Sequence, residues 1–164
     1  MMNSNVLGNF ALVLAWIAAL AGIVSGIVSG LVDSRQFCRV ATHSTRMVGF
    51  GLTVAICCLA YSFLQSDYTN QYVWQYSNRD MPWVYRVSAI WGGMDGSMLL
   101  WCFFHGIGAW IVSLQVEKFP RRLSPWMLAT LNASLLFFAS IVVFLTNPFR
   151  HIEAPFIPPD GNGL

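Results

Sequence analysis

The sequence predicts an all-α integral membrane protein with four transmembrane helices. Only 10% of its 164 residues are charged and 56% are hydrophobic, whereas about a quarter of the residues of an ordinary soluble domain are charged. Spanning the hydrocarbon layer takes roughly 20 apolar residues as helix, and four stretches without Asp, Glu, Lys or Arg approach or exceed this length: residues 6–31, 47–64, 98–116 and 126–146. We therefore predict a single membrane domain over residues 1–164. The net charge of +2 is too small to indicate nucleic-acid binding.

The first stretch, residues 6–31, is expected to be a retained membrane span rather than a signal peptide. No Lys or Arg precedes it, and it is longer than the apolar core of a signal peptide. Its last part, GIVSGIVSG, carries glycines at four-residue intervals: Gly22, Gly26 and Gly30. Small residues at this spacing let another helix approach closely. We predict a packing face whose partner lies in this chain or in another, with ordinary glycine enrichment of membrane helices as the alternative.

The basic residues predict the orientation in the membrane. Six of the nine lie in two predicted loops, 33–46 and 117–124: Arg35, Arg39, Arg46, Lys118, Arg121 and Arg122. Lys and Arg are enriched in cytoplasmic loops. Both termini and the central loop 65–97 are therefore expected to face outward, into the periplasm or its topological equivalent.

The central loop 65–97 is rich in aromatic residues. Tyr72, Trp74 and Tyr76 alternate, which predicts a short extended piece. Asp80 is expected to cap a short surface helix with Pro82 in its first turn. The aromatic side chains form either an interfacial belt or a platform for a flat hydrophobic ligand or a partner protein. The candidate platform comprises Trp74, Trp83, Tyr85 and Arg86.

The stretch WGGMDGSMLLW leads from this loop into the third span. Its glycines, Gly92, Gly93 and Gly96, permit a sharp turn of the backbone. Asp95 is expected to cap the N–H groups of the following helix, together with Ser97. Arg86 is its candidate counter-charge.

Capping alone does not require Trp91 and Trp101 on either side of Asp95. A functional contact of this carboxylate with a cationic group of a partner is therefore the second interpretation. We expect the contact to be its main role and capping an additional one.

Residues 82–101, PWVYRVSAIWGGMDGSMLLW, closely resemble the signature of the CcmF/CycK/NrfE family, the membrane heme-lyase component of the cytochrome c maturation machinery. The segments LGNFAL, LTNPF and PPDGNGL also resemble the family, so the resemblance extends over essentially the whole chain. Asp95 stands where the family usually has Glu, which keeps the charge but shortens its reach by one methylene. The signature residues in this sequence are Trp91, Gly92, Gly93, Asp95, Gly96, Ser97 and Trp101.

The resemblance implies an N-terminal portion of such a protein, either a split gene product, a truncation or a fragment. The family's tryptophan-rich heme-handling domain and heme-ligating histidines have no matching positions here. Heme is thus the implied cofactor of the complete assembly, with no ligand in this chain, no metal site and no assigned catalytic residue. The implied partners are membrane lipid, the remaining part of the heme lyase, other cytochrome c maturation subunits and, indirectly, apocytochrome c and a heme chaperone.

The implied location is the bacterial inner membrane, with the mitochondrial inner membrane as the alternative. Whether the chain alone is an enzyme stays open. The competing function is a small membrane scaffold or transporter subunit without direct heme chemistry. A transporter is disfavoured because Asp95 and His105 are the ionisable groups expected near membrane depth. A complete enzyme is disfavoured because the sequence contains no Ser/His/Asp set, metal-ligand cluster or phosphate loop; His43, His105 and His151 are not assigned as heme ligands.

Overall fold

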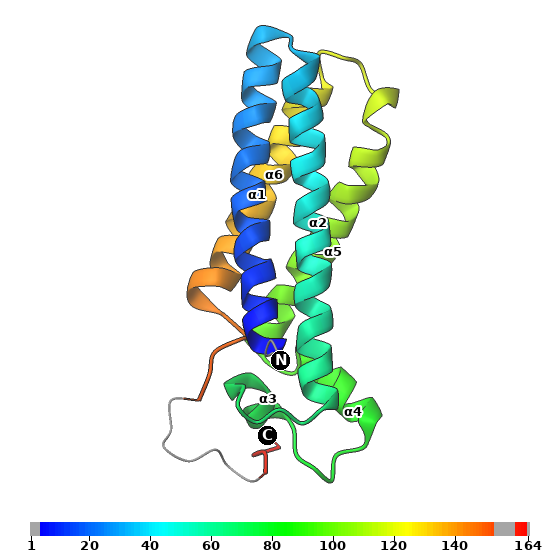
Figure 1. Cartoon of the computed structure of the whole chain (residues 1–164). Coiled ribbons are helices and arrows are strands. Elements are labelled where there is room, and N and C mark those ends of the chain that lie inside the picture. The colour runs from blue at the N-terminus through cyan, green and yellow to red at the C-terminus, as the bar shows by residue number, and fades with distance from the viewer. Residues whose placement is uncertain (1–3, 153–159, 164) are drawn as a thin grey trace.

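Four long helices make up most of the protein. The computed structural model describes residues 4–152 and 160–163. The long helices are α1 (Ser4–Val32), α2 (Arg35–Leu64), α5 (Met94–Leu114) and α6 (Ser124–Ser140), the last continued by the π-helical turn η3 (Ile141–Leu145). All four are long and apolar enough to cross a membrane, and they lie together as a bundle (Figure 1). The predicted all-α membrane fold is confirmed.

Each long helix begins before the uncharged stretch that predicted it. α2 begins at Arg35 rather than at residue 47, so most of the predicted loop 33–46 is helical. α5 begins at Met94 and therefore includes Asp95 in its first turn. The absence of charge marks the part of a helix that suits hydrocarbon, but backbone hydrogen bonding continues through polar residues that reach the headgroup layer or water.

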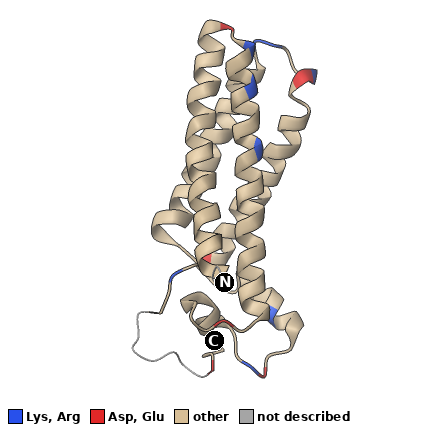
Figure 2. Ribbon diagram, in the orientation of Figure 1, with Lys and Arg blue, Asp and Glu red and all other residues tan. Residues whose placement is uncertain are grey.

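The two ends of the bundle differ in charge. We call the end with the α1–α2 turn and the connection between α5 and α6 the basic end, because it carries the six basic residues of segments 33–46 and 117–124. The opposite end, which we call the motif end, holds α3 (Gln71–Tyr76), α4 (Trp83–Ser88) and the start of α5. Charged residues gather toward these two ends (Figure 2), and both chain termini lie at the motif end (Figure 1).

The glycine strip of α1 lies against α6 of the same chain. A Cβ atom added to any of its glycines would come within 3.0 Å of a side chain on α6: Gly22 of Asn132, Gly26 of Ala129 and Gly30 of Trp126. The backbones approach closely because glycine leaves room for these side chains. The packing partner is therefore intramolecular.

The central loop forms two short helices rather than an extended piece and one helix. The extended piece predicted for Tyr72, Trp74 and Tyr76 is wrong, because Gln71–Tyr76 is the helix α3. α4 begins at Trp83 with Pro82 at its N-cap position and no side-chain cap bond, so the capping role predicted for Asp80 is also wrong. Alternating aromatic residues are typical of a strand. This local pattern does not reveal tertiary contacts, and here such contacts favour a helix.

A buried asparagine explains why α3 is helical. Asn70 is completely buried, and its side-chain oxygen accepts hydrogen bonds from the backbone N–H groups of Tyr72 at 2.8 Å and Val73 at 3.2 Å. Its amide nitrogen donates to Asn5 Oδ1 at 2.7 Å and to the carbonyl oxygen of Pro148 at 2.9 Å. One side chain thus caps α3 and joins it to the start of α1 and to the segment after α6.

Candidate functional site

The hydroxyl of Tyr72 lies at the centre of the motif end. Tyr72 is buried, and its ring packs edge-on against Phe63 with the ring centroids 5.7 Å apart. Its oxygen accepts a hydrogen bond from the backbone N–H of Gly93 at 2.9 Å, and its O–H lies 3.1 Å from the carbonyl oxygen of Ile90. Burial raises the pKa of Tyr72 to about 12, because desolvation disfavours the phenolate. The group is therefore a neutral hydroxyl that holds the glycine-rich motif in place.

Gly93 and Gly96 are required by the close approach of this tyrosine and its neighbour, and not by a positive φ. A Cβ atom on Gly93 would lie 2.5 Å from the hydroxyl oxygen of Tyr76. A Cβ atom on Gly96 would overlap the carbonyl oxygen of Ile90 and lie 2.6 Å from the hydroxyl of Tyr72. The short helix η1 (Ala89–Trp91) can fold back onto the start of α5 because these two positions have no side chain.

Two further hydrogen bonds shape the turn between η1 and α5. The backbone N–H of Gly92 donates to the carbonyl oxygen of Ala89 at 3.0 Å. The hydroxyl of Ser97 donates to the carbonyl oxygen of Trp91 at 2.9 Å. Ser97 thus ties the turn to the first residues of the helix, instead of sharing an N-cap role with Asp95.

Asp95 lies in the first turn of α5 but does not cap the helix. The N-cap residue is Gly93 and no side chain caps the helix, so the predicted capping role is wrong. Asp95 forms no hydrogen bond or ion pair with any described residue. Its charge still lies in the favourable field of the helix N-terminus, and Arg150 is the cation that acts on it electrostatically.

Arg86, the predicted counter-charge of Asp95, has other partners. Its guanidinium donates to the carbonyl oxygens of Met81 at 2.9 Å and Arg79 at 2.7 Å, and to the hydroxyl of Ser66 at 2.9 Å. These bonds attach the loop before α4 to the end of α2. Arg86 therefore stabilises the loop, and the predicted Arg86–Asp95 pair is wrong.

The aromatic residues singled out from the sequence differ in exposure. Trp91 and Trp101, which flank the motif, are 49% and 73% exposed. Trp83 and Tyr85 on α4 are exposed as well, whereas Trp74 is partly buried and packs against the core. Exposed aromatic side chains at an interface suit a flat apolar ligand, a protein partner or the headgroup layer. Trp91 and Trp101 are the exposed aromatic pair that flanks the motif.

The three histidines lie on separate elements. His43 is on α2, His105 on α5, and His151 follows α6. The ring of His105 packs against Phe138, with centroids 6.0 Å apart, and its Nε2 is buried without a hydrogen-bond partner among the described residues. Within the described part of the chain, no three His, Cys, Asp or Glu side chains lie close enough to hold a metal ion.

Sequence reasoning missed the buried polar residues of the motif end and the docking of residues 160–163. The backbone N–H of Asn162 donates to the carbonyl oxygen of Trp74 at 2.7 Å. The Asp160 carboxylate accepts from the N–H groups of Arg79 at 2.9 Å and Gly161 at 2.7 Å, and these bonds lower the pKa of Asp160. Because Trp74 and Arg79 are far from residues 160–163 in the sequence, no local spacing indicated their contacts.

Comparisons with known proteins agree on one family. The chain is 32% identical to the cytochrome c-type biogenesis protein CcmF of Pseudomonas aeruginosa, over 96% of this chain and 24% of the relative. It is 37% identical to the cytochrome c-type biogenesis protein NrfE of Haemophilus influenzae, over 68% of this chain and 17% of the relative. No protein-family model matches the sequence.

A solved structure shares the fold. The structure of the cytochrome c heme lyase CcmF superposes with a TM-score of 0.83 over 92% of this chain and 25% of the solved chain, at 22% sequence identity. The chain thus spans about a quarter or less of the length of each of these proteins.

Proposed function

This chain belongs to the CcmF/CycK/NrfE family of cytochrome c-type biogenesis proteins, and on this premise we propose that it forms a membrane portion of a heme lyase assembly. Its relatives are several times longer, so the attachment of heme to apocytochrome c is assigned to the assembly and heme is its substrate. The proposed role of this chain is to bind and orient heme or the subunit that carries it. The remaining part of the heme lyase and the other maturation subunits are the proposed partners.

The observation that carries the proposal is the way the motif is held. The buried Tyr72 hydroxyl bonds to the backbone of Gly93, while Trp91 and Trp101 on either side of the motif remain exposed. A rigid support beneath exposed indole rings limits the conformational entropy lost when a flat apolar molecule binds. The motif end therefore suits contact with heme or with the subunit that carries it.

The proposed orientation places the motif end outside the membrane and the basic end in the cytoplasm. Six of the nine basic residues belong to segments 33–46 and 117–124, and basic loops are retained on the cytoplasmic side. The proposed location is the bacterial inner membrane. Reporter fusions at Gly163 and within the connection between α5 and α6 test this orientation, because they must report opposite sides.

Cytochrome c maturation in cells tests the function. The experiment uses a strain in which cytochrome c maturation requires this chain. Covalent heme in the c-type cytochromes of that strain is measured by peroxidase staining. The double variant Trp91→Ala/Trp101→Ala is expected to lose most of the covalent heme while the protein still accumulates. Phe137→Ala, a change of a comparably exposed aromatic residue on α6, is the matched control. Undiminished maturation in the double variant would favour a scaffold without contact to heme.

A further inference from the structure

A cavity of about 430 Å³ lies at the basic end, remote from the motif end. It is bounded by the α1–α2 turn, the first turns of α2 and the connection between α5 and α6. Charged side chains and hydroxyl groups share its wall, and three of the charged residues are arginines: Arg35, Arg39 and Arg121. The carboxylates in the wall are those of Asp33 and Glu117, so the cavity is positive overall.

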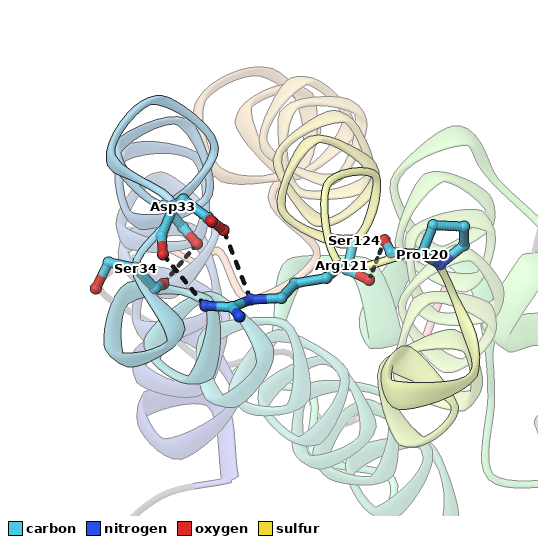
Figure 3. Close-up of polar contacts among 6 residues, drawn as sticks. Asp33, Ser34, Pro120, Arg121 and Ser124 are labelled. Atoms are coloured by element: carbon cyan, nitrogen blue, oxygen red, sulfur yellow. Dashed lines mark hydrogen bonds and ion pairs between the residues drawn. The ribbon is translucent and has the colours of Figure 1, made fainter.

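One of these arginines is engaged within the protein. Arg121 reaches from the connection between α5 and α6 to the α1–α2 turn (Figure 3), where its Nε lies 3.6 Å from Oδ1 of Asp33. The same guanidinium donates to the carbonyl oxygen of Asp33 at 3.5 Å. Asp33 itself adopts a φ of 47°, in the left-handed region that Asp tolerates better than most residues. The Arg121–Asp33 pair thus joins the two connections that line the cavity and neutralises one of its positive charges.

The other two arginines have no partner in the described chain. Arg35 and Arg39 form no hydrogen bond or ion pair with any described residue. They are four residues apart on α2, so they project from the same face of the helix. Both side chains are exposed, so water and salt screen part of their mutual repulsion, and an anion between them would offset the rest.

We propose that this cavity binds a phosphate group through Arg35 and Arg39. Guanidinium groups form paired, charge-assisted hydrogen bonds with phosphate oxygens. Ser34, whose hydroxyl forms no hydrogen bond with a described residue, also lines the cavity and offers a further donor to the ligand. The site lies at the opposite end of the bundle from Trp91 and Trp101, the proposed contact with heme. The proposal therefore does not depend on the proposed function.

The surroundings of the cavity favour the phosphate of an anionic phospholipid over a soluble ion. α1 has 29 residues, which corresponds to a length of about 43 Å and exceeds the roughly 30 Å of hydrocarbon. The basic end is therefore expected at headgroup depth. Leu31 and Val32 at the end of α1 are 71% and 62% exposed, and Phe119 in the cavity wall is also exposed, so acyl chains have apolar surface beside the phosphate.

Lipid retention by the purified full chain tests the proposal. Native mass spectrometry compares the chain incubated with phosphatidylglycerol or with phosphatidylcholine, and inorganic phosphate is titrated separately against thermal stability. We expect one retained phosphatidylglycerol per chain. The double variant Arg35→Gln/Arg39→Gln is expected to bind the lipid roughly tenfold more weakly. The loss of even one charge-assisted hydrogen bond lowers affinity by about this factor.

The matched control is Lys118→Gln/Arg122→Gln. It removes the same two charges from the same end, but neither residue lines the cavity. Melting temperatures in phosphatidylcholine that equal that of the native chain show that both double variants fold. Saturable binding of inorganic phosphate that needs Arg35 and Arg39 would support the site with a soluble anion as its source. Equal loss of lipid in both double variants, or no loss in either, would overturn the proposal.

Discussion

The side-chain amide of Asn70 donates a hydrogen bond to Oδ1 of Asn5 at 2.7 Å, although α1 and α2 separate the two residues in sequence. Both side chains are buried. A third segment joins them, since Asn70 also donates to the carbonyl oxygen of Pro148. The motif end is therefore held by a polar network within an otherwise apolar bundle, and its members have no solvent to replace a lost partner.

Asn70→Ala is expected to lower the free energy of unfolding by about 2–3 kcal/mol. The change removes the side chain that donates to Asn5 Oδ1 and to the Pro148 carbonyl and that caps α3, and the loss of a buried hydrogen-bond partner costs about 1–3 kcal/mol. Thermal unfolding of the purified chain in detergent, followed by circular dichroism, measures the effect. Gln71→Ala, at an exposed position next in the chain, is the control. Equal melting temperatures for the two variants would contradict the role given to the network.

Tyr72→Phe is expected to cost about 1–2 kcal/mol, because the partly buried N–H of Gly93 loses its acceptor. Tyr76→Phe is the control, since the Tyr76 hydroxyl forms no hydrogen bond with a described residue. The comparison of their melting temperatures isolates the contribution of the Tyr72 hydroxyl. An equal or larger loss in Tyr76→Phe would contradict the role given to the Tyr72 hydroxyl.

The same residue predicts a dependence on alkaline pH. Burial raises the pKa of Tyr72 from 10.0 to about 12, so the folded state holds this proton more tightly than the unfolded state does. The associated stability is complete below about pH 10 and is lost as the pH rises toward 12. Tyr72→Phe should therefore lose less stability than the native chain between these pH values. Parallel pH profiles for the two proteins would exclude this assignment.

Gly96→Ala is expected to destabilise the motif end by about 1–3 kcal/mol or more, because the new Cβ overlaps the carbonyl oxygen of Ile90. Gly108→Ala on the same helix is the matched control, since a Cβ atom there meets nothing within 4 Å. The measurement is the melting temperature of the two variants. If Gly108→Ala were the more damaging change, α5 would have a different packed face.

Gly26→Leu is expected to separate α1 from α6, because its side chain would occupy the space next to Ala129. The expected results are a lower melting temperature and weaker co-purification with the rest of the assembly. Ala21→Leu, at an exposed position of α1, adds comparable bulk outside the contact. If both variants behave like the native chain, the glycine strip does not determine helix packing.

Asp95→Asn is expected to change the stability of the isolated chain by no more than about 1 kcal/mol. Asp95 provides no cap bond, so only its interactions with the helix dipole and with the charge of Arg150 are lost. Maturation of c-type cytochromes is nevertheless expected to fail with Asn and to persist with Glu, if a cationic group of a partner contacts the carboxylate. Near-normal maturation with Asn, at equal protein levels, would contradict a functional contact of Asp95 with a partner.

The sequence by itself determined the four membrane helices and the charge difference between the two ends of the bundle. Both depend on local properties, namely the length of uncharged stretches and the position of basic residues such as Arg35 and Arg121. The sequence alone also shows that residues 82–101 resemble a family signature. These features do not require knowledge of which helices touch.

Only the tertiary structure decided which side chains meet. The sequence pattern predicts an extended piece at Tyr72, yet this residue lies in a helix and its hydroxyl bonds to the backbone of Gly93. The pattern also pairs Arg86 with Asp95, yet the guanidinium of Arg86 donates to Met81, Arg79 and Ser66. A polar or charged group takes the partner that packing brings within hydrogen-bond distance, and that partner depends on contacts between segments far apart in the chain. Local sequence patterns carry no information about such distances.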